Sequence, residues 1–158
     1  MILAALTFSL ASATFKPNAT MPMSTVCSRY GGSNISPELH WQGAPKGTKS
    51  FALIVHDPDA PHPGGWYHWV AYGFPPTMHD LTAGAALPPA LAGFNSGAQQ
   101  SYEGPCPPPG KPHHYHFTLY ALDYMPALDK DFTGPQFEAA IKGHVLARTT
   151  LTGIYESH

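Results

Sequence analysis

The segment 104–123, which reads GPCPPPGKPHHYHFTLYALD, constrains the fold more than any other part of the chain because it changes character halfway along. Its first part, 104–112, contains five prolines and two glycines. Proline fixes a backbone angle and has no amide hydrogen to donate, so this part predicts a stiff loop and excludes a helix or a central strand. The second part, 113–122, is rich in aromatic residues and predicts a strand that leaves the loop.

Side chains alternate between the two faces of a strand, and this alternation separates the polar residues at the start of the predicted strand. His113 and Tyr115 lie on the face that continues into an apolar row, whereas His114 and His116 lie on the opposite face. A histidine and a tyrosine at the mouth of a core suit a small polar pocket. A polar strand end that merely meets solvent accounts for the same residues.

A second predicted strand, 50–56, carries an apolar row that leads to an acidic residue. Phe51 and Val55 mark this row, and the alternation places Asp57 on the same face. A carboxylate at the end of an apolar row is costly unless a partner satisfies it, so Asp57 is a candidate both for a pocket and for a turn. For Asp59 we favour the turn, because aspartate beside proline forms hydrogen bonds within turns.

The segment 66–74 predicts a third strand with bulky residues on both faces. Regular alternation gives one face to Trp66, His68, Val70 and Tyr72, and the other to Tyr67, Trp69 and Ala71. A single histidine in such a row is commonly a satisfied core residue. Because Asp57 precedes this strand by one short turn, the two strands are expected to pair, and His68 is also a candidate partner for Asp57.

Two elements follow the proline-rich segment. Phe137, Ile141 and Val145 recur at a spacing of four and predict an amphipathic helix over 136–146. The alternation over 149–155 predicts a closing strand.

The first residues permit two interpretations. The small residues at 11–13 mimic a signal-peptide cleavage site, but no basic region precedes them, and the alternation over 6–12 favours a first strand. We therefore expect a single domain over 1–158, in which 1–7 is a residual leader or an extension.

Composition limits the classes of partner. Only 11% of the residues are charged and the net charge is −2, which provides neither a field for nucleic acid nor a basic face for anionic membranes. The sequence contains no uninterrupted apolar run near the about 20 residues of a membrane span. Ten histidines raise the question of a metal, but the usual metal-ligand spacings are not evident, so we expect neither a metal nor a cofactor.

Three sequence blocks carry a family resemblance: DPDAP at 57–61, GGWYHWV at 64–70 and the proline-rich segment 104–123. In this order they resemble the phosphatidylethanolamine-binding protein (PEBP) family, specifically its small bacterial branch of Raf kinase inhibitor-like proteins. The resemblance covers roughly 8–155. It implies a mostly β fold, with two antiparallel sheets in a Greek-key sandwich, one short helix near the C-terminal end, long loops and a small anion-binding pocket.

The resemblance also implies which residues form the pocket. These are Asp57, Trp66, His68, His113 and Tyr115, with Gly104, Cys106, Pro107 and Pro108 forming a wall. The sequence departs from the family pattern in two ways. The helix that closes the pocket in longer eukaryotic members has no counterpart after Tyr155, and His114 stands where many relatives have an arginine.

The two cysteines, Cys27 and Cys106, form no motif by themselves and suit either one disulfide or two buried thiols. The resemblance favours a Cys27–Cys106 disulfide beside the pocket. Such a bond would indicate a periplasmic or secreted protein, and its absence a cytoplasmic one.

The expected function is non-catalytic binding of a small anion, such as phosphate or a phospholipid headgroup. Candidate donors are His68, His113, the Tyr115 hydroxyl and the backbone amides of Gly104, Cys106 and Gly110. Asp57 would hold the tautomer of a histidine, or keep it protonated, and would repel a fully ionised ligand.

Two other functions stay open. The pocket resembles the parts of a hydrolase, but the sequence has no G-x-S-x-G nucleophile motif and Cys106 has no evident base. The resemblance also allows regulation of a partner kinase or protease through the pocket rim. The sequence does not determine the oligomeric state, and a homodimer is compatible with it.

Overall fold

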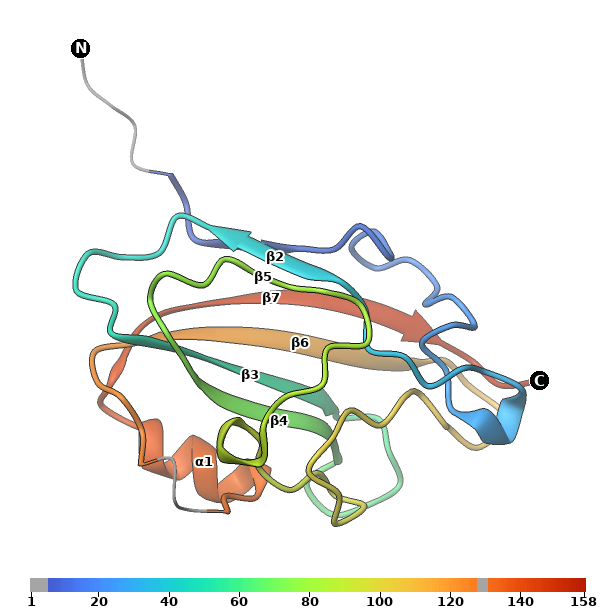
Figure 1. Ribbon diagram of the computed structural model, residues 1–158. Coiled ribbons are helices and arrows are strands. Elements are labelled where there is room, and N and C mark those ends of the chain that lie inside the picture. The colour runs from blue at the N-terminus through green and yellow to red at the C-terminus, as the bar shows by residue number, and fades with distance from the viewer. Residues whose placement is uncertain (1–5, 128–130) are drawn as a thin grey trace.

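Two antiparallel sheets make up the fold, as predicted (Figure 1). The computed structural model describes residues 6–127 and 131–158. The smaller sheet has the strand order β1-β2-β5, and the larger sheet has the order β4-β3-β6-β7. The strands are β1 (Ser9–Ala11), β2 (Leu39–Gln42), β3 (Ser50–Asp57), β4 (Trp66–Phe74), β5 (Asp80–Leu81), β6 (His113–Leu122) and β7 (Val145–Tyr155). The connections contain the 3-10 helices η1 (Ser28–Tyr30) and η2 (Pro89–Leu91) and the α-helix α1 (Gly134–Ile141).

Strand β3 lies inside the larger sheet and brings the ends of three strands together. It pairs with β4, where Asp57 lies opposite Trp66, and with β6, where His56 lies opposite His116. Between β4 and β6 the chain crosses to the smaller sheet as β5 and then returns. The last residue of β3 therefore lies beside the first residues of β4 and β6, at one end of the sheet.

Both faces of β3 are buried. Phe51 and Val55 pack in the core between the two sheets, whereas Ala52 and Ile54 pack beneath α1. Because burying a large apolar side chain contributes about 1.5–3 kcal/mol, packing on both faces fixes this strand firmly. Its last residue, Asp57, inherits that fixed position.

Strand β4 contains a β-bulge near its start. Val55 of β3 lies opposite Trp69, but the next residue, His56, lies opposite Tyr67. His68 is therefore an additional residue that has no counterpart on β3. Such a bulge bends a strand and re-aims its side chains.

The bulge corrects the prediction for the faces of β4. Trp66 and His68 both line a cavity at the end of the sheet. Beyond the bulge, Trp69 packs between the sheets, whereas Val70 and Tyr72 pack beneath α1. The prediction that Trp66, His68, Val70 and Tyr72 share one face is thus wrong, because the additional residue exchanges the two faces.

The helix predicted over 136–146 is shorter than the apolar spacing indicated. Thr133 caps its start by accepting a hydrogen bond from a backbone amide of the first turn, and the helix ends at Ile141. Gly143 has a φ of 87°, in the left-handed region that favours glycine, and turns the chain toward β7. Val145 therefore begins a strand instead of continuing the apolar face of the helix.

The first strand, β1, begins at Ser9 and is shorter than the alternation over 6–12 predicted. Within the predicted leader or extension 1–7, residues 1–5 lie outside the described residues. Across 6–127 and 131–158, the structure has no helix with the length and apolar character that crossing a membrane requires.

Candidate functional site

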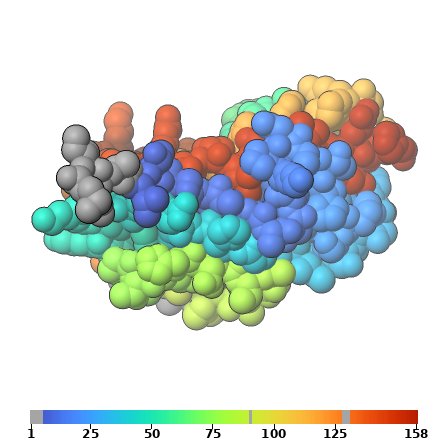
Figure 2. Space-filling model, turned by 90° about the horizontal axis from the view of Figure 1, so that it is seen from above, coloured from blue at the N-terminus to red at the C-terminus, as the bar shows by residue number. Residues whose placement is uncertain are grey.

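A cavity of about 370 Å³ opens where β3, β4 and β6 meet the proline-rich loop. Figure 2 shows the gold loop, the red C-terminal end and the blue segment after β1 gathered at one end of the molecule. Apart from Gly104, all of the predicted pocket residues line this cavity. The three strand ends and the loop thus bring together residues that are far apart in the sequence.

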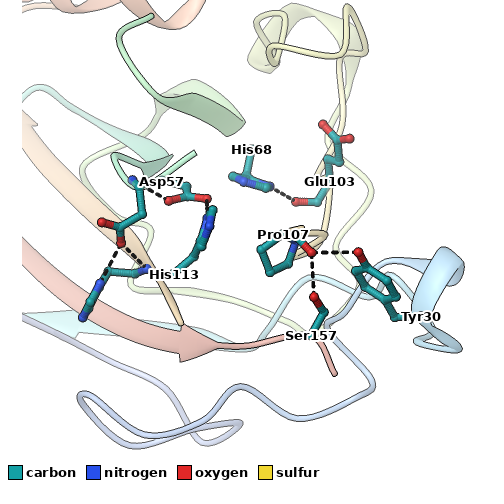
Figure 3. Close-up of polar contacts among 9 residues, drawn as sticks. Tyr30, Asp57, His68, Glu103, Pro107, His113 and Ser157 are labelled. Atoms are coloured by element: carbon teal, nitrogen blue, oxygen red, sulfur yellow. Dashed lines mark hydrogen bonds and ion pairs between the residues drawn. The ribbon is translucent and has the colours of Figure 1, made fainter. Parts of the chain in front are cut away.

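Asp57 and His113 form a buried pair on adjacent strands (Figure 3). The Nδ1–H of His113 donates to Oδ2 of Asp57 at 2.7 Å, and the two residues are 1% and 2% exposed. The other oxygen, Oδ1, accepts a hydrogen bond from the backbone N–H of Asp59 at 2.8 Å. Asp57 thus has the partner that its apolar row required, and it orients the His113 ring so that Nε2 is the nitrogen remaining for a ligand.

His68 has a different partner from the one considered in the sequence. Its Nδ1 lies 2.8 Å from the main-chain oxygen of Glu103, whereas the hydrogen bond of Asp57 goes to His113. Burial lowers the pKa of His68, although the nearby Glu103 and Asp57 oppose this shift. A neutral imidazole near pH 7 follows, with its Nδ1–H directed at the carbonyl.

Tyr115 lines the cavity and carries a buried hydroxyl. Its ring packs edge-on against His68, with 5.1 Å between the ring centroids. Burial raises the pKa of Tyr115, and the charge of Asp57 adds to the rise, so the phenol keeps its proton. Among the described residues this hydroxyl has no hydrogen-bond partner. A buried polar group without a hydrogen-bond partner lowers the stability of a protein by about 1–3 kcal/mol, and a ligand that bonded to it would remove this penalty.

The opposite wall consists of the proline-rich loop, which is tied to two distant parts of the chain. The hydroxyls of Tyr30 and Ser157 donate to the carbonyl of Pro107 at 2.7 and 2.8 Å (Figure 3). A disulfide joins Cys27 to Cys106, as the resemblance implied. The segment after β7 therefore contacts the loop through Ser157.

Two glycines of the loop do not face the cavity. The Gly104 amide donates to the Asn34 side chain at 2.7 Å, and a Cβ on Gly104 would lie 2.2 Å from the Thr25 carbonyl oxygen. Gly110 lines a neighbouring hollow, which shares Pro61, Pro108 and His113 with the cavity. Of the three amides considered as donors, the structure leaves that of Cys106 beside the cavity.

Asp59 and His114 form a second pair outside the cavity. Oδ2 of Asp59 accepts hydrogen bonds from the backbone N–H of His114 at 2.8 Å and from its Nδ1–H at 2.7 Å. Burial opposes the charge of Asp59, but these hydrogen bonds outweigh it and lower the pKa of the carboxyl. The side chain of Asp59 therefore ties the turn to β6, whereas the hydrogen bond within the turn that the sequence context indicated is accepted by Asp57.

The sequence did not identify two charged residues that line the cavity. Arg29 lies on η1, and Glu103 precedes the loop, where its Oε2 accepts a hydrogen bond from the Trp66 indole N–H at 2.9 Å. The implied Cys27–Cys106 bond was the one signal for Arg29, because it draws the neighbours of Cys27 to the loop. For Glu103, only its position next to the loop was informative.

The cavity thus combines hydrogen-bond donors with one basic and two acidic side chains. Arg29 is the one lysine or arginine among its described lining residues, and Asp57 and Glu103 each accept a hydrogen bond from a ring N–H. In the described part of the chain, no group of three or more histidine, cysteine or acidic residues is placed to hold a metal ion. The arrangement can hold a small polar molecule through Arg29, His68, His113 and Tyr115.

Comparisons with known proteins agree with this architecture. A family model described as phosphatidylethanolamine-binding protein matches residues 11–156. The UPF0098 protein YbcL of Escherichia coli K12 is 37% identical, over 98% of this chain and 94% of that protein. A UPF0098 protein of Methanothermobacter thermautotrophicus is 40% identical, over 89% of this chain and 96% of that protein. The crystal structure of E. coli YbcL, described as a new member of the mammalian PEBP family, matches with a TM-score of 0.87 at 36% identity, covering 96% of this chain and 99% of that one.

Proposed function

Because the chain belongs to the phosphatidylethanolamine-binding protein family, we propose that its cavity binds a small phosphate-type anion without chemical turnover. The anion is either free or part of a phospholipid headgroup. A volume of about 370 Å³ suits a headgroup-sized ligand and is at the lower end of small-molecule sites.

The buried Tyr115 hydroxyl is the observation that carries this proposal. It is protonated, belongs to a residue that lines the cavity and has no partner within the described residues. A phosphate oxygen would accept its hydrogen bond. Arg29 at the same cavity would neutralise charge on the ligand, and His113 supplies a second ring nitrogen.

The lining residues favour binding over catalysis. Cys106 is in a disulfide, and the described lining contains neither serine nor threonine, so a side-chain nucleophile of the usual kind is lacking. The two imidazoles and Asp57 nevertheless keep a hydrolase as the alternative. Sustained release of p-nitrophenol from p-nitrophenyl phosphate, lost in His113→Ala, would favour that alternative.

Calorimetric titration with inorganic phosphate and with phosphoethanolamine tests the proposal. Tyr115→Phe should weaken binding by about threefold to tenfold, which corresponds to the loss of one hydrogen bond. The matched control is Tyr124→Phe, because the Tyr124 hydroxyl bonds to the Ala140 carbonyl near α1, away from the cavity. Equal affinities of the two variants would contradict the role of Tyr115, and no binding of either probe to the wild-type protein would overturn the proposal.

Vesicles distinguish the two sources of the anion. Co-sedimentation with phosphatidylethanolamine vesicles, competed by phosphoethanolamine, would indicate a lipid headgroup, whereas binding of the soluble probes alone would indicate a free anion. Regulation of a partner kinase or protease through the cavity rim stays a prediction.

A further inference from the structure

His68 and His113 line the same cavity, but the Nδ1 of His68 bonds to a main-chain carbonyl and that of His113 bonds to a carboxylate. The partner of His68 bears on which protonation state of a ligand the site would bind. We propose that His68 accepts a hydrogen bond from a hydroxyl of the ligand, so that the site selects a singly protonated phosphomonoester over anions of the same shape that carry no proton. This inference rests on the proposed function and narrows its ligand class.

The tautomer of His68 follows from its partner. Nδ1 lies 2.8 Å from the main-chain oxygen of Glu103, and a carbonyl oxygen only accepts hydrogen bonds. Nδ1 must therefore carry a hydrogen, and in the neutral ring Nε2 carries a lone pair. The backbone N–H of Glu103 donates in turn to the carbonyl of His68 at 2.9 Å, which holds the two residues together and keeps this tautomer in place.

His113 has a negatively charged group behind it instead of a neutral one. Its Nδ1–H bonds to the Asp57 carboxylate at 2.7 Å. The carbonyl behind His68 carries no net charge, so this hydrogen bond supplies no negative group that would stabilise an imidazolium. Figure 3 shows the two rings close together, with Pro107 across from them. On the strand side of the cavity, the main-chain partner of His68 thus leaves its Nε2 as a hydrogen-bond acceptor.

The surroundings of His68 keep it neutral. The charged and titratable groups that line the same cavity or act on His68 are Arg29, His56, Asp57, His62, Glu103, His113 and Tyr115. Burial is the largest influence and lowers the pKa of His68; Glu103 and Asp57 raise it, and His56 lowers it further. His68 is 4% exposed, in keeping with burial as the largest influence on its pKa.

A lone pair on Nε2 discriminates between ligands. A P–OH group donates to it, whereas an oxygen without a proton places two electron-rich atoms against each other and leaves a buried acceptor unsatisfied. Sites with a buried polar group reject a ligand that lacks the complementary group. We expect a preference of at least about fivefold, because an unsatisfied buried group costs about 1–3 kcal/mol.

Methyl phosphate and methyl sulfate provide a matched pair of probes. They have similar shapes, but methyl sulfate has no proton to donate, and methyl phosphate loses its own with a second pKa of about 6. Calorimetry across about pH 5.5–8 should show at least about a fivefold preference for methyl phosphate at the acid end. Because the charge of methyl sulfate is constant, its profile reports the protein alone, and the ratio of the two affinities should fall about tenfold per pH unit above the second pKa.

The results separate this inference from the proposed function. If both probes bind with equal affinity, or if the ratio rises with pH, the inference is wrong and the proposed function stands. If neither probe nor inorganic phosphate binds, both are wrong.

Two further measurements test His68 directly. In His68→Gln the amide offers both a donor and an acceptor, so the preference for methyl phosphate should fall below about threefold, whereas His40→Gln on β2 should retain it. Ring ¹⁵N shifts of the wild-type protein should show His68 protonated at Nδ1 and not at Nε2, a result that does not depend on any variant folding. An unchanged preference in His68→Gln, or an Nε2–H tautomer, would overturn the proposal.

Discussion

The two walls of the cavity are positioned by different kinds of structure. The strand wall consists of Asp57, His68, His113 and Tyr115, all at most 4% exposed and all carried by β3, β4 or β6. The loop wall consists of Arg29 and residues 106–108, which lie outside both sheets. Sheet pairing holds the strand wall, whereas a disulfide and the hydrogen bonds of Pro107 hold the loop wall.

This difference separates two tasks. The strand wall determines which hydrogen bonds a ligand receives, because tautomers and ring positions are set there by buried partners. The loop wall determines the charge and the width of the entrance, because Arg29 and the prolines depend on the crosslink. A substitution in one wall should therefore leave the structure of the other wall unchanged.

The largest expected effect is on the strand wall. Asp57→Ala leaves His113 without its partner, and the free energy of unfolding should fall by about 3–5 kcal/mol, as for other buried pairs that lose one member. The control is Asp123→Ala, because Asp123 bonds to His144 at 2.8 Å with both side chains near 45% exposed. That exposed pair should contribute less than about 1 kcal/mol. If urea unfolding showed similar losses of stability for Asp57→Ala and Asp123→Ala, the buried pair would contribute no more than the exposed one.

The loop wall should respond to reduction. Cys27 and Cys106 are 79 residues apart, and losing their bond should lower the free energy of unfolding by about 2–4 kcal/mol. Urea unfolding of Cys27→Ser/Cys106→Ser, compared with the wild type with and without a dithiol, measures this. The ring ¹⁵N shifts of His113 should not change, because its bond to Asp57 lies within the sheet. A shift of that signal on reduction would show that the walls are coupled.

The smallest expected effect concerns charge at the entrance. Arg29 is exposed, so Arg29→Gln should leave the melting temperature unchanged and weaken phosphate binding by about fivefold. Arg148→Gln on β7 is the matched control, because Arg148 is also exposed and lies on a strand outside the cavity. Equal phosphate affinities of the two variants, measured by calorimetry, would show that Arg29 does not contact the ligand.

The sequence predicts the strand wall only where side-chain alternation is regular. In β6, His113 and Tyr115 are buried while His114 and His116 are partly exposed, as the alternation predicted. In β4 both faces carry large apolar residues, so nothing in the pattern marks the additional residue. The bulge arises from pairing with β3, which a single strand does not reveal.

The loop wall was predictable only in part. Proline content identified the stiff loop, and the family resemblance implied the disulfide. Neither showed that the Gly104 amide would bond to Asn34, since that contact depends on how segment 25–34 folds back over the loop. Arg29 was missed for the same reason, because its position follows from a long-range crosslink and not from local spacing.

The additional residue in β4 makes residue count as important as residue identity at this end of the sheet. Deleting one amino acid between Trp66 and Trp69 would allow regular pairing with β3 to resume and would withdraw the imidazole from the ligand, even if every remaining side chain were kept. Transplanting this site into another scaffold therefore requires copying the irregular strand as a unit, together with the backbone carbonyl that faces it.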